Sequence, residues 1–187
     1  MVAAFRLEDA ETPVVLMGYL NPIEAMGYEA FAEQASLSGV DGLITVNLPP
    51  EEAGPLAMAL QEKEIDPIYL LAPTTTDARA VAVCQASRGF VYYVSLKGTT
   101  GSGSLDIKAV CERVAHLKAK TALPLFVGFG IKDGATAAPI AEVADGVVVG
   151  SAIVTLMGEF EASPQALKLA VIELVRDIRT ALNASNP

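Results

Sequence analysis

The sequence has few of the residues on which disulfides, zinc sites and nucleophilic triads depend. It has one histidine and two cysteines among 187 residues. Cys84 and Cys111 are too few for a disulfide framework or a metal site, and both fall at apolar positions of predicted helices. We therefore expect them to pack in the core. His116 lies opposite the apolar face of its predicted helix, so we expect it to be solvated, which excludes a Ser-His-Asp or Cys-His arrangement.

Basic residues and long apolar runs are also scarce. Lys and Arg total 13 against 22 Asp and Glu, which gives a net charge of −9 and argues against a nucleic-acid partner. No run reaches the roughly 18 apolar residues of a membrane span, and Met1–Arg6 has no signal-peptide core. The chain is nevertheless 52% hydrophobic, so it should fold. We expect a cytoplasmic protein with a single domain over residues 1–187 and no membrane partner.

Short apolar runs alternate with helical patterns along the chain. Six runs are predicted as buried parallel strands: Val14–Gly18, Gly42–Val46, Ile68–Ala72, Val91–Ser95, Leu125–Gly128 and Gly146–Val149. The predicted helices are Pro22–Leu37, Pro50–Glu64, Thr76 or Asp77 to Ser87, Asp106–Lys120, Asp133–Val143 and Pro164–Leu182. Strict alternation of this kind predicts an α/β fold with a parallel sheet.

The number of strands is too small for a closed barrel. A TIM-type (β/α) barrel needs eight strands, and residues 1–13 are too few for another βα unit. We expect an incomplete TIM-barrel-type fold of about six parallel βα units, lacking the first two. Its open edges at Val14–Gly18 and Gly146–Val149 would pair with another chain, so we expect a homo-oligomer that covers them.

Glycines punctuate the last two predicted strands and indicate a ligand. Val127–Ile131 ends one apolar run with two glycines, and Gly146–Ala152 ends the next before a helix can begin. Glycine lets the backbone approach an anion, and the N–H groups at a helix start supply donors. Neighbouring strand ends of this kind predict a phosphate-binding cradle at one edge of the sheet.

Two further features have both a functional and an ordinary interpretation. The Gly/Ser/Thr-rich segment Ser95–Ser104 is either a lid beside the cradle or an exposed connector. Tyr19 and Tyr92 either line an apolar substrate pocket or pack in the core. Alternation along the strand points Tyr92 and Tyr93 to opposite faces.

Acid–base groups are missing from the predicted strand ends. These ends offer Tyr19, Asn47, Thr74, Lys97, Gly130 and Gly150. Glu51 and Asp133 lie a few residues further on, where they are interpreted as first-turn acids of helices. The sequence therefore predicts no paired catalytic carboxylates, no metal and no cofactor.

Taken in order, these motifs closely resemble the α subunit of tryptophan synthase from about Thr12 to near the C-terminus. The segments that carry the resemblance are Pro13–Pro22, Val40–Glu52, Leu71–Thr76, Gly89–Gly101, Gly128–Gly130 and Gly150–Ser151. They are similar to the family's third to eighth strands, its mobile loop and its phosphate site.

The resemblance implies a fold, a reaction and a set of site residues. The family fold is a TIM barrel that performs retro-aldol cleavage of indole-3-glycerol phosphate to indole and glyceraldehyde 3-phosphate. The indole then passes to a β subunit that carries pyridoxal phosphate. The implied phosphate-binding residues are Gly101, Gly130, Gly150 and Ser151. The implied indole-pocket residues are Tyr19 and Tyr92, with Thr100 in the closing loop.

The chain also departs from the family pattern. The family's catalytic Glu and Asp belong to its second strand and the loop after it, and no segment of this sequence corresponds to them. Asn47 stands where the family usually carries Asp. We therefore assign no catalytic residue and expect impaired lyase activity. The alternative is a non-catalytic phosphate-binding barrel fragment that self-assembles.

Overall fold

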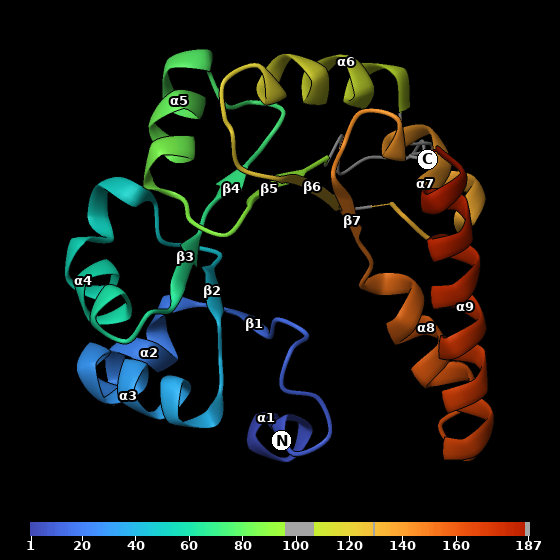
Figure 1. Cartoon of the computed structure of the whole chain (residues 1–187), viewed down its shortest axis with the longest axis horizontal. Coiled ribbons are helices and arrows are strands. Elements are labelled where there is room, and N and C mark those ends of the chain that lie inside the picture. Colours follow the sequence, from blue (N-terminus) through green and yellow to red (C-terminus); the bar gives the residue numbers. More distant parts are fainter. Residues whose placement is uncertain (96–106, 129, 186–187) are drawn as a thin grey trace. The chain divides into compact units, whose positions relative to one another are not determined.

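The computed structural model describes residues 1–95, 107–128 and 130–185, and these form an alternating α/β chain with parallel strand pairs (Figure 1). Residues 1–70 and 76–91 make one compact unit, and residues 71–75 and 92–187 make another. Each unit is described below by itself. A single domain and self-association stay predictions.

The first unit contains a three-stranded sheet in the order β1–β2–β3. β1 (Val15–Gly18), β2 (Gly42–Thr45) and β3 (Asp66–Ile68) are parallel, and the central β2 is buried along its whole length. Its helices are α1 (Val2–Arg6), α2 (Leu20–Met26), α3 (Tyr28–Ser38), the 3₁₀ turn η1 (Pro50–Glu52), α4 (Gly54–Glu62) and α5 (Asp77–Ala86). Helices α2, α3 and α4 lie side by side (Figure 1), and α4 also contacts β3.

An Asp–Gly dipeptide begins β2 and fixes its register against β1. The Asp41 N–H donates to the Val14 carbonyl at 2.9 Å, and the Asp41 carboxylate accepts from the Val14 N–H at 2.6 Å. Arg6 pairs with the same carboxylate. A Cβ at Gly42 would lie 2.9 Å from the Ile68 side chain, so only glycine fits here without a shift.

The second sheet has the order β4–β5–β6–β7, and its β6–β7 pair is parallel. The strands are β4 (Leu70–Leu71), β5 (Val91–Val94), β6 (Leu125–Gly128) and β7 (Gly146–Val148). The helices of the second unit are α6 (Ile107–Lys118), α7 (Gly134–Ala141), α8 (Ser151–Glu159) and α9 (Pro164–Ser185). α9 packs along α7, where its Asp177 carboxylate accepts from the Gly134 N–H at 2.6 Å.

The Asp–Gly arrangement recurs at the start of β7. The Asp145 N–H donates to the Leu125 carbonyl at 3.0 Å, and the Asp145 carboxylate accepts from the Leu125 N–H at 2.8 Å. Lys118 pairs with the other carboxylate oxygen at 2.8 Å. A Cβ at Gly146 would lie 3.0 Å from the Phe126 ring. Both units thus begin a strand with the same pair of hydrogen bonds.

Several sequence predictions about local structure are confirmed. The Thr76 side chain caps α5, whereas Asp133, interpreted from the sequence as a first-turn acid, is the N-cap of α7. Val110, Val114 and Leu117 on the predicted apolar face of α6 are buried. Cys84 is buried, Cys111 is partly buried with its thiol 3.4 Å from the Pro139 carbonyl oxygen, and His116 is exposed. Within the described ranges, none of the helices combines the length and hydrophobicity that a bilayer span requires.

Other predicted boundaries are wrong. The predicted strand Ile68–Ala72 is divided at Tyr69 into the ends of β3 and β4, which belong to different sheets. The predicted helix Pro22–Leu37 is two helices separated by Gly27, whose φ of +90° only glycine adopts readily. The predicted helix Pro50–Glu64 is η1 followed by α4. The helix α1 was not predicted, and α8 was expected only as a helix start after Gly150, without bounds.

Candidate functional site

The carboxyl ends of β6 and β7 lie at one edge of the second sheet. Gly128 is opposite Val148 in the parallel register, and Gly130 and Gly150 each follow two residues later. Gly130 is exposed with φ of +81°, a conformation that favours glycine. Gly150 is the N-cap of α8, and Ser151 is the first residue of that helix. The structure therefore brings three of the predicted phosphate-binding residues to the same edge.

This edge has the chemistry that an anion requires. The Ile153 and Val154 N–H groups donate to the Gly150 carbonyl at 3.0 and 3.1 Å, so the Ser151 and Ala152 N–H groups precede the first bonds of the helix, where an anion can accept from them. Among residues 1–95, 107–128 and 130–185, no heavy atom lies within 4 Å of a Cβ built at Gly150, so these residues leave space for an anion beside it. Gly101 and Thr100, the other residues predicted here, lie outside the described residues.

Gly128 serves a different purpose from the two glycines after it. It is buried, and a Cβ there would lie 2.1 Å from the Tyr92 hydroxyl oxygen and 2.5 Å from a ring carbon. Its carbonyl accepts from the N–H and the hydroxyl of Ser95, at 3.0 and 2.9 Å. The absent side chain therefore makes room for Tyr92 rather than for a ligand.

Tyr92 is almost completely covered inside the second unit. Only 7% of it is exposed, and burial raises the pKa of its phenol, which stays protonated. Tyr93 is also buried, so both faces of β5 are covered. This burial fits core packing, and the role of Tyr92 in an indole pocket stays a prediction.

Tyr19 lies at an exposed apolar edge of the first unit. It is 62% exposed, and Met17 and Val46 are 56% and 38% exposed. Met17 and Tyr19 share one face of the chain by alternation. Gly18 is opposite Thr45 in the β1–β2 register, and the Val46 N–H donates to the Gly18 carbonyl at 2.9 Å. Met17, Tyr19 and Val46 therefore form one apolar surface, called here the β1–β2 exit.

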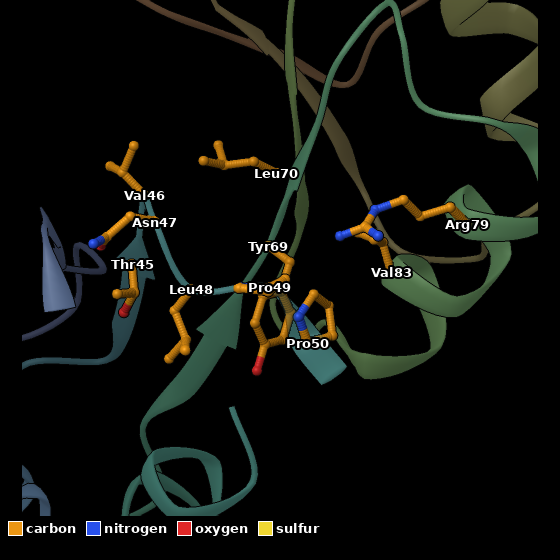
Figure 2. Close-up of a pocket in the computed structure, with 10 residues that line it drawn as sticks. All are labelled: Thr45, Val46, Asn47, Leu48, Pro49, Pro50, Tyr69, Leu70, Arg79 and Val83. Atoms are coloured by element: carbon orange, nitrogen blue, oxygen red, sulfur yellow. The ribbon is translucent and has the colours of Figure 1, made fainter. Parts of the chain in front are cut away.

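A cavity of about 300 Å³ opens beside this exit (Figure 2). Its lining combines the β2 end and the loop after it with residues of two other segments: Thr45, Val46, Asn47, Leu48, Pro49, Pro50, Tyr69, Leu70, Arg79 and Val83. Figure 2 shows Arg79 extending from α5 toward this loop, and its guanidinium lies 3.4 Å from the Glu51 carboxylate. Asn47 connects the cavity to the start of α2, because its side-chain oxygen accepts from the Leu20 N–H at 2.8 Å.

The two carboxylates nearest the strand ends have structural partners. Glu51 pairs with Arg79, as above. The Asp133 carboxylate accepts from the Thr136 N–H and hydroxyl, and these bonds lower its pKa. An ionised N-cap of this kind is a poor proton donor. Across residues 1–95, 107–128 and 130–185, no group of three or more His, Cys, Asp or Glu side chains could hold a metal ion.

Comparison with known proteins shows the family of this chain. The family model described as "Tryptophan synthase alpha chain" matches residues 1–183. The chain belongs to the tryptophan synthase alpha chain family. A relative of that name from Thioalkalivibrio sulfidiphilus is 56% identical over 183 residues, which cover 98% of this chain and 69% of the relative.

Solved structures of the family have the same fold. The tryptophan synthase subunit alpha of Legionella pneumophila matches with a TM-score of 0.86 and 42% identity, over 98% of this chain and 67% of its own. A chain from the tryptophan synthase α2β2 complex of Pyrococcus furiosus matches with a TM-score of 0.84 and 35% identity, over 96% and 71%. The chain thus spans about two thirds of the length of these relatives.

Two residues of the β1–β2 exit could have been predicted from the sequence of this tryptophan synthase alpha-type chain. One hydrogen bond beside the exit could not. Met17 and Val46 have the same alternation as Tyr19, so the period of two in adjacent strands would have grouped them. The bond from the Leu20 N–H to Asn47 has no such signal, because the two residues are 27 positions apart.

Proposed function

We propose that this chain binds indole-3-glycerol phosphate, the substrate of the tryptophan synthase alpha reaction, with the phosphate at Gly130, Gly150 and Ser151. The observation that carries this proposal is the shared edge of β6 and β7, where an open helix start follows Gly150. Gly101 and the Thr100 loop belong to the same proposal through the resemblance. By the resemblance, Tyr19 and Tyr92 are the proposed indole contacts, and each is tested separately.

We further propose that the retro-aldol step is impaired in this chain alone. Cleavage of the substrate needs groups that move a proton, and Glu51 and Asp133 are already engaged in an ion pair and a helix cap. Loss of an acid–base group typically lowers a rate by about 10² to 10⁴-fold. We therefore expect binding of the phosphate ester with turnover near background.

Binding and turnover can be separated with one glycine. Gly150→Val places a branched side chain in the open space above α8, so it should weaken binding of a phosphate ester by more than about tenfold. Gly158→Val is the matched control, because Gly158 lies in the same helix and no described residue lies within 4 Å of a Cβ built there either. Calorimetry measures binding of glycerol 3-phosphate, and thermal unfolding checks that both variants remain folded.

Two outcomes would contradict these proposals. Equal binding by wild type and Gly150→Val would remove the phosphate from this edge. Rapid release of indole from indole-3-glycerol phosphate by the purified chain alone would show that an acid–base pair is present after all.

We propose the tryptophan synthase β subunit as the partner, on the strength of the similarity to the chain from the P. furiosus α2β2 complex. A mixture of this chain with a β subunit should elute as a complex in size-exclusion chromatography with light scattering. The same mixture should be assayed for indole release. Separate elution of the two proteins at micromolar concentration would contradict the pairing.

The second candidate is a non-catalytic, self-associating phosphate-binding module. It is favoured by exposed apolar residues on the last two helices, Val154 and Met157 on α8 and Leu169 and Val175 on α9. Scattering of the chain alone across a wide concentration range tests it. A monomer down to low micromolar concentration would contradict self-association.

A further inference from the structure

Asn47, in the loop after β2, caps helix α2, which begins shortly after the neighbouring strand β1. α2 begins at Leu20, directly after β1, and its N-cap Tyr19 has an extended backbone and no side-chain cap bond of its own. The first N–H groups of a helix need an acceptor from elsewhere. The Asn47 side-chain oxygen, at the end of β2, supplies one to the Leu20 N–H at 2.8 Å.

This bond continues the strand pairing past the point where the backbone ladder stops. The last backbone bond runs from the Val46 N–H to the Gly18 carbonyl. The Asn47 bond follows one residue after Val46 on one side and two residues after Gly18 on the other. Tyr19 is therefore held at the residue before it and at the residue after it.

Packing alone does little to hold Tyr19. Its side chain is largely exposed, so few neighbours restrict where the ring lies. The direction in which the ring leaves the chain is therefore set by the backbone on either side. Loss of the bond between the Leu20 N–H and Asn47 would therefore change the position of Tyr19 first.

We propose that Asn47 is a positioning residue that fixes Tyr19 at the β1–β2 exit so that its ring can contact an indole ring. This inference rests on the proposed function for the identity of the ligand. An Asp at this position would keep an oxygen acceptor and would add a negative charge at the start of α2, which the helix dipole favours. An Ala would leave the Leu20 N–H to water.

The test compares Asn47→Ala and Asn47→Asp with wild type, using two measurements. Hydrogen exchange of the Leu20 amide, followed by NMR, reports the bond itself. Indole binding is followed by the fluorescence of indole, since the chain contains no tryptophan. Inorganic phosphate binding is measured alongside as a property of the other glycine-built edge.

In Asn47→Ala the Leu20 amide should exchange about three- to tenfold faster, and indole should bind weaker by a similar factor, as expected for loss of one hydrogen bond. Phosphate binding should not change, and Asn47→Asp should restore both properties. Asn183→Ala, an equal change at an exposed position of α9, is the matched control and should resemble wild type.

An unchanged Leu20 exchange rate in Asn47→Ala would overturn the proposal. So would an equal loss of indole and phosphate binding, because that pattern indicates general unfolding rather than positioning. If wild type binds no indole, the proposed function fails. The positioning of Tyr19 is then decided by whether Asn47→Ala alters the exchange of Leu20 and the NMR signals of the Tyr19 ring, and unaltered signals would refute it.

Discussion

The two units begin their strands in the same way and end them differently. At the amino ends, Asp41 exchanges two hydrogen bonds with Val14, just before β1, and Asp145 exchanges two with Leu125, the first residue of β6, and a glycine follows each aspartate. At the carboxyl ends, the first unit presents side chains, Met17, Tyr19 and Val46. The second presents glycines and the start of α8.

The difference separates what holds the sheets from what they offer to a ligand. The Asp–Gly pair recurs at the amino ends of strands in both units because both need a fixed strand register. The carboxyl ends of parallel strands are where such folds place their ligands, and there the two units diverge. The β1–β2 exit offers a ligand its side chains. The carboxyl ends of β6 and β7 offer backbone groups that are accessible because glycine has no side chain.

The largest effect should come from replacing the two predicted indole-pocket tyrosines. Tyr92→Ala removes a buried ring and should lower the free energy of unfolding by about 3–5 kcal/mol. Tyr19→Ala removes an exposed ring and should change it by less than about 0.5 kcal/mol, while indole binding falls. Urea denaturation with indole titration measures both. Similar losses in the free energy of unfolding for the two variants would contradict the prediction that Tyr92 is a core residue and Tyr19 is not.

A smaller effect is expected from adding one methyl group at Gly128. Gly128→Ala should destabilise the second unit by about 1–3 kcal/mol, because the buried and rigid Tyr92 ring occupies the space. The double variant Gly128→Ala with Tyr92→Ala should lose less than the sum of the two single variants. Strict additivity in urea denaturation would show that the ring and the methyl group do not compete.

The smallest effect concerns the Asp–Gly device and depends on pH. Burial opposes ionisation of Asp145, but Lys118 and the Leu125 N–H outweigh it, so its pKa lies below the ordinary 3.8. Ionised Asp145 therefore stabilises the folded state above pH 3.8, and this contribution is lost as pH falls through the lower folded-state pKa.

Asp145→Asn should thus cost about 0.2–1 kcal/mol at pH 7, as for a partly exposed pair, and nothing once the pH is below that pKa. Stability curves of wild type and variant from pH 7 to pH 2 check this. A difference that grows toward low pH would mean that the sign is wrong.

Sequence alone predicted the alternation of strands and helices and the glycine edge, because apolar period and glycine position are local signals. It did not predict that the chain changes sheets at Tyr69, because an unbroken apolar run gives no sign of a change of partner. It also treated Gly128 together with Gly130, although one makes room for a ring and the other adopts a positive φ. Such differences depend on neighbours that are distant in sequence.

The Asp–Gly pairs also bear on how the protein ages. In such dipeptides the glycine nitrogen can attack the aspartate carboxyl carbon and expel water to close a succinimide ring, and hydrolysis of that ring leaves aspartate or isoaspartate. The chain has three of them, at 41–42, 133–134 and 145–146, and in each the carboxylate accepts a backbone N–H bond.

Ring closure requires those bonds to be given up, so the reaction should proceed only when a strand start or the α7 cap opens. The isoaspartate content of a stored sample would then measure how often each of these three places opens during storage.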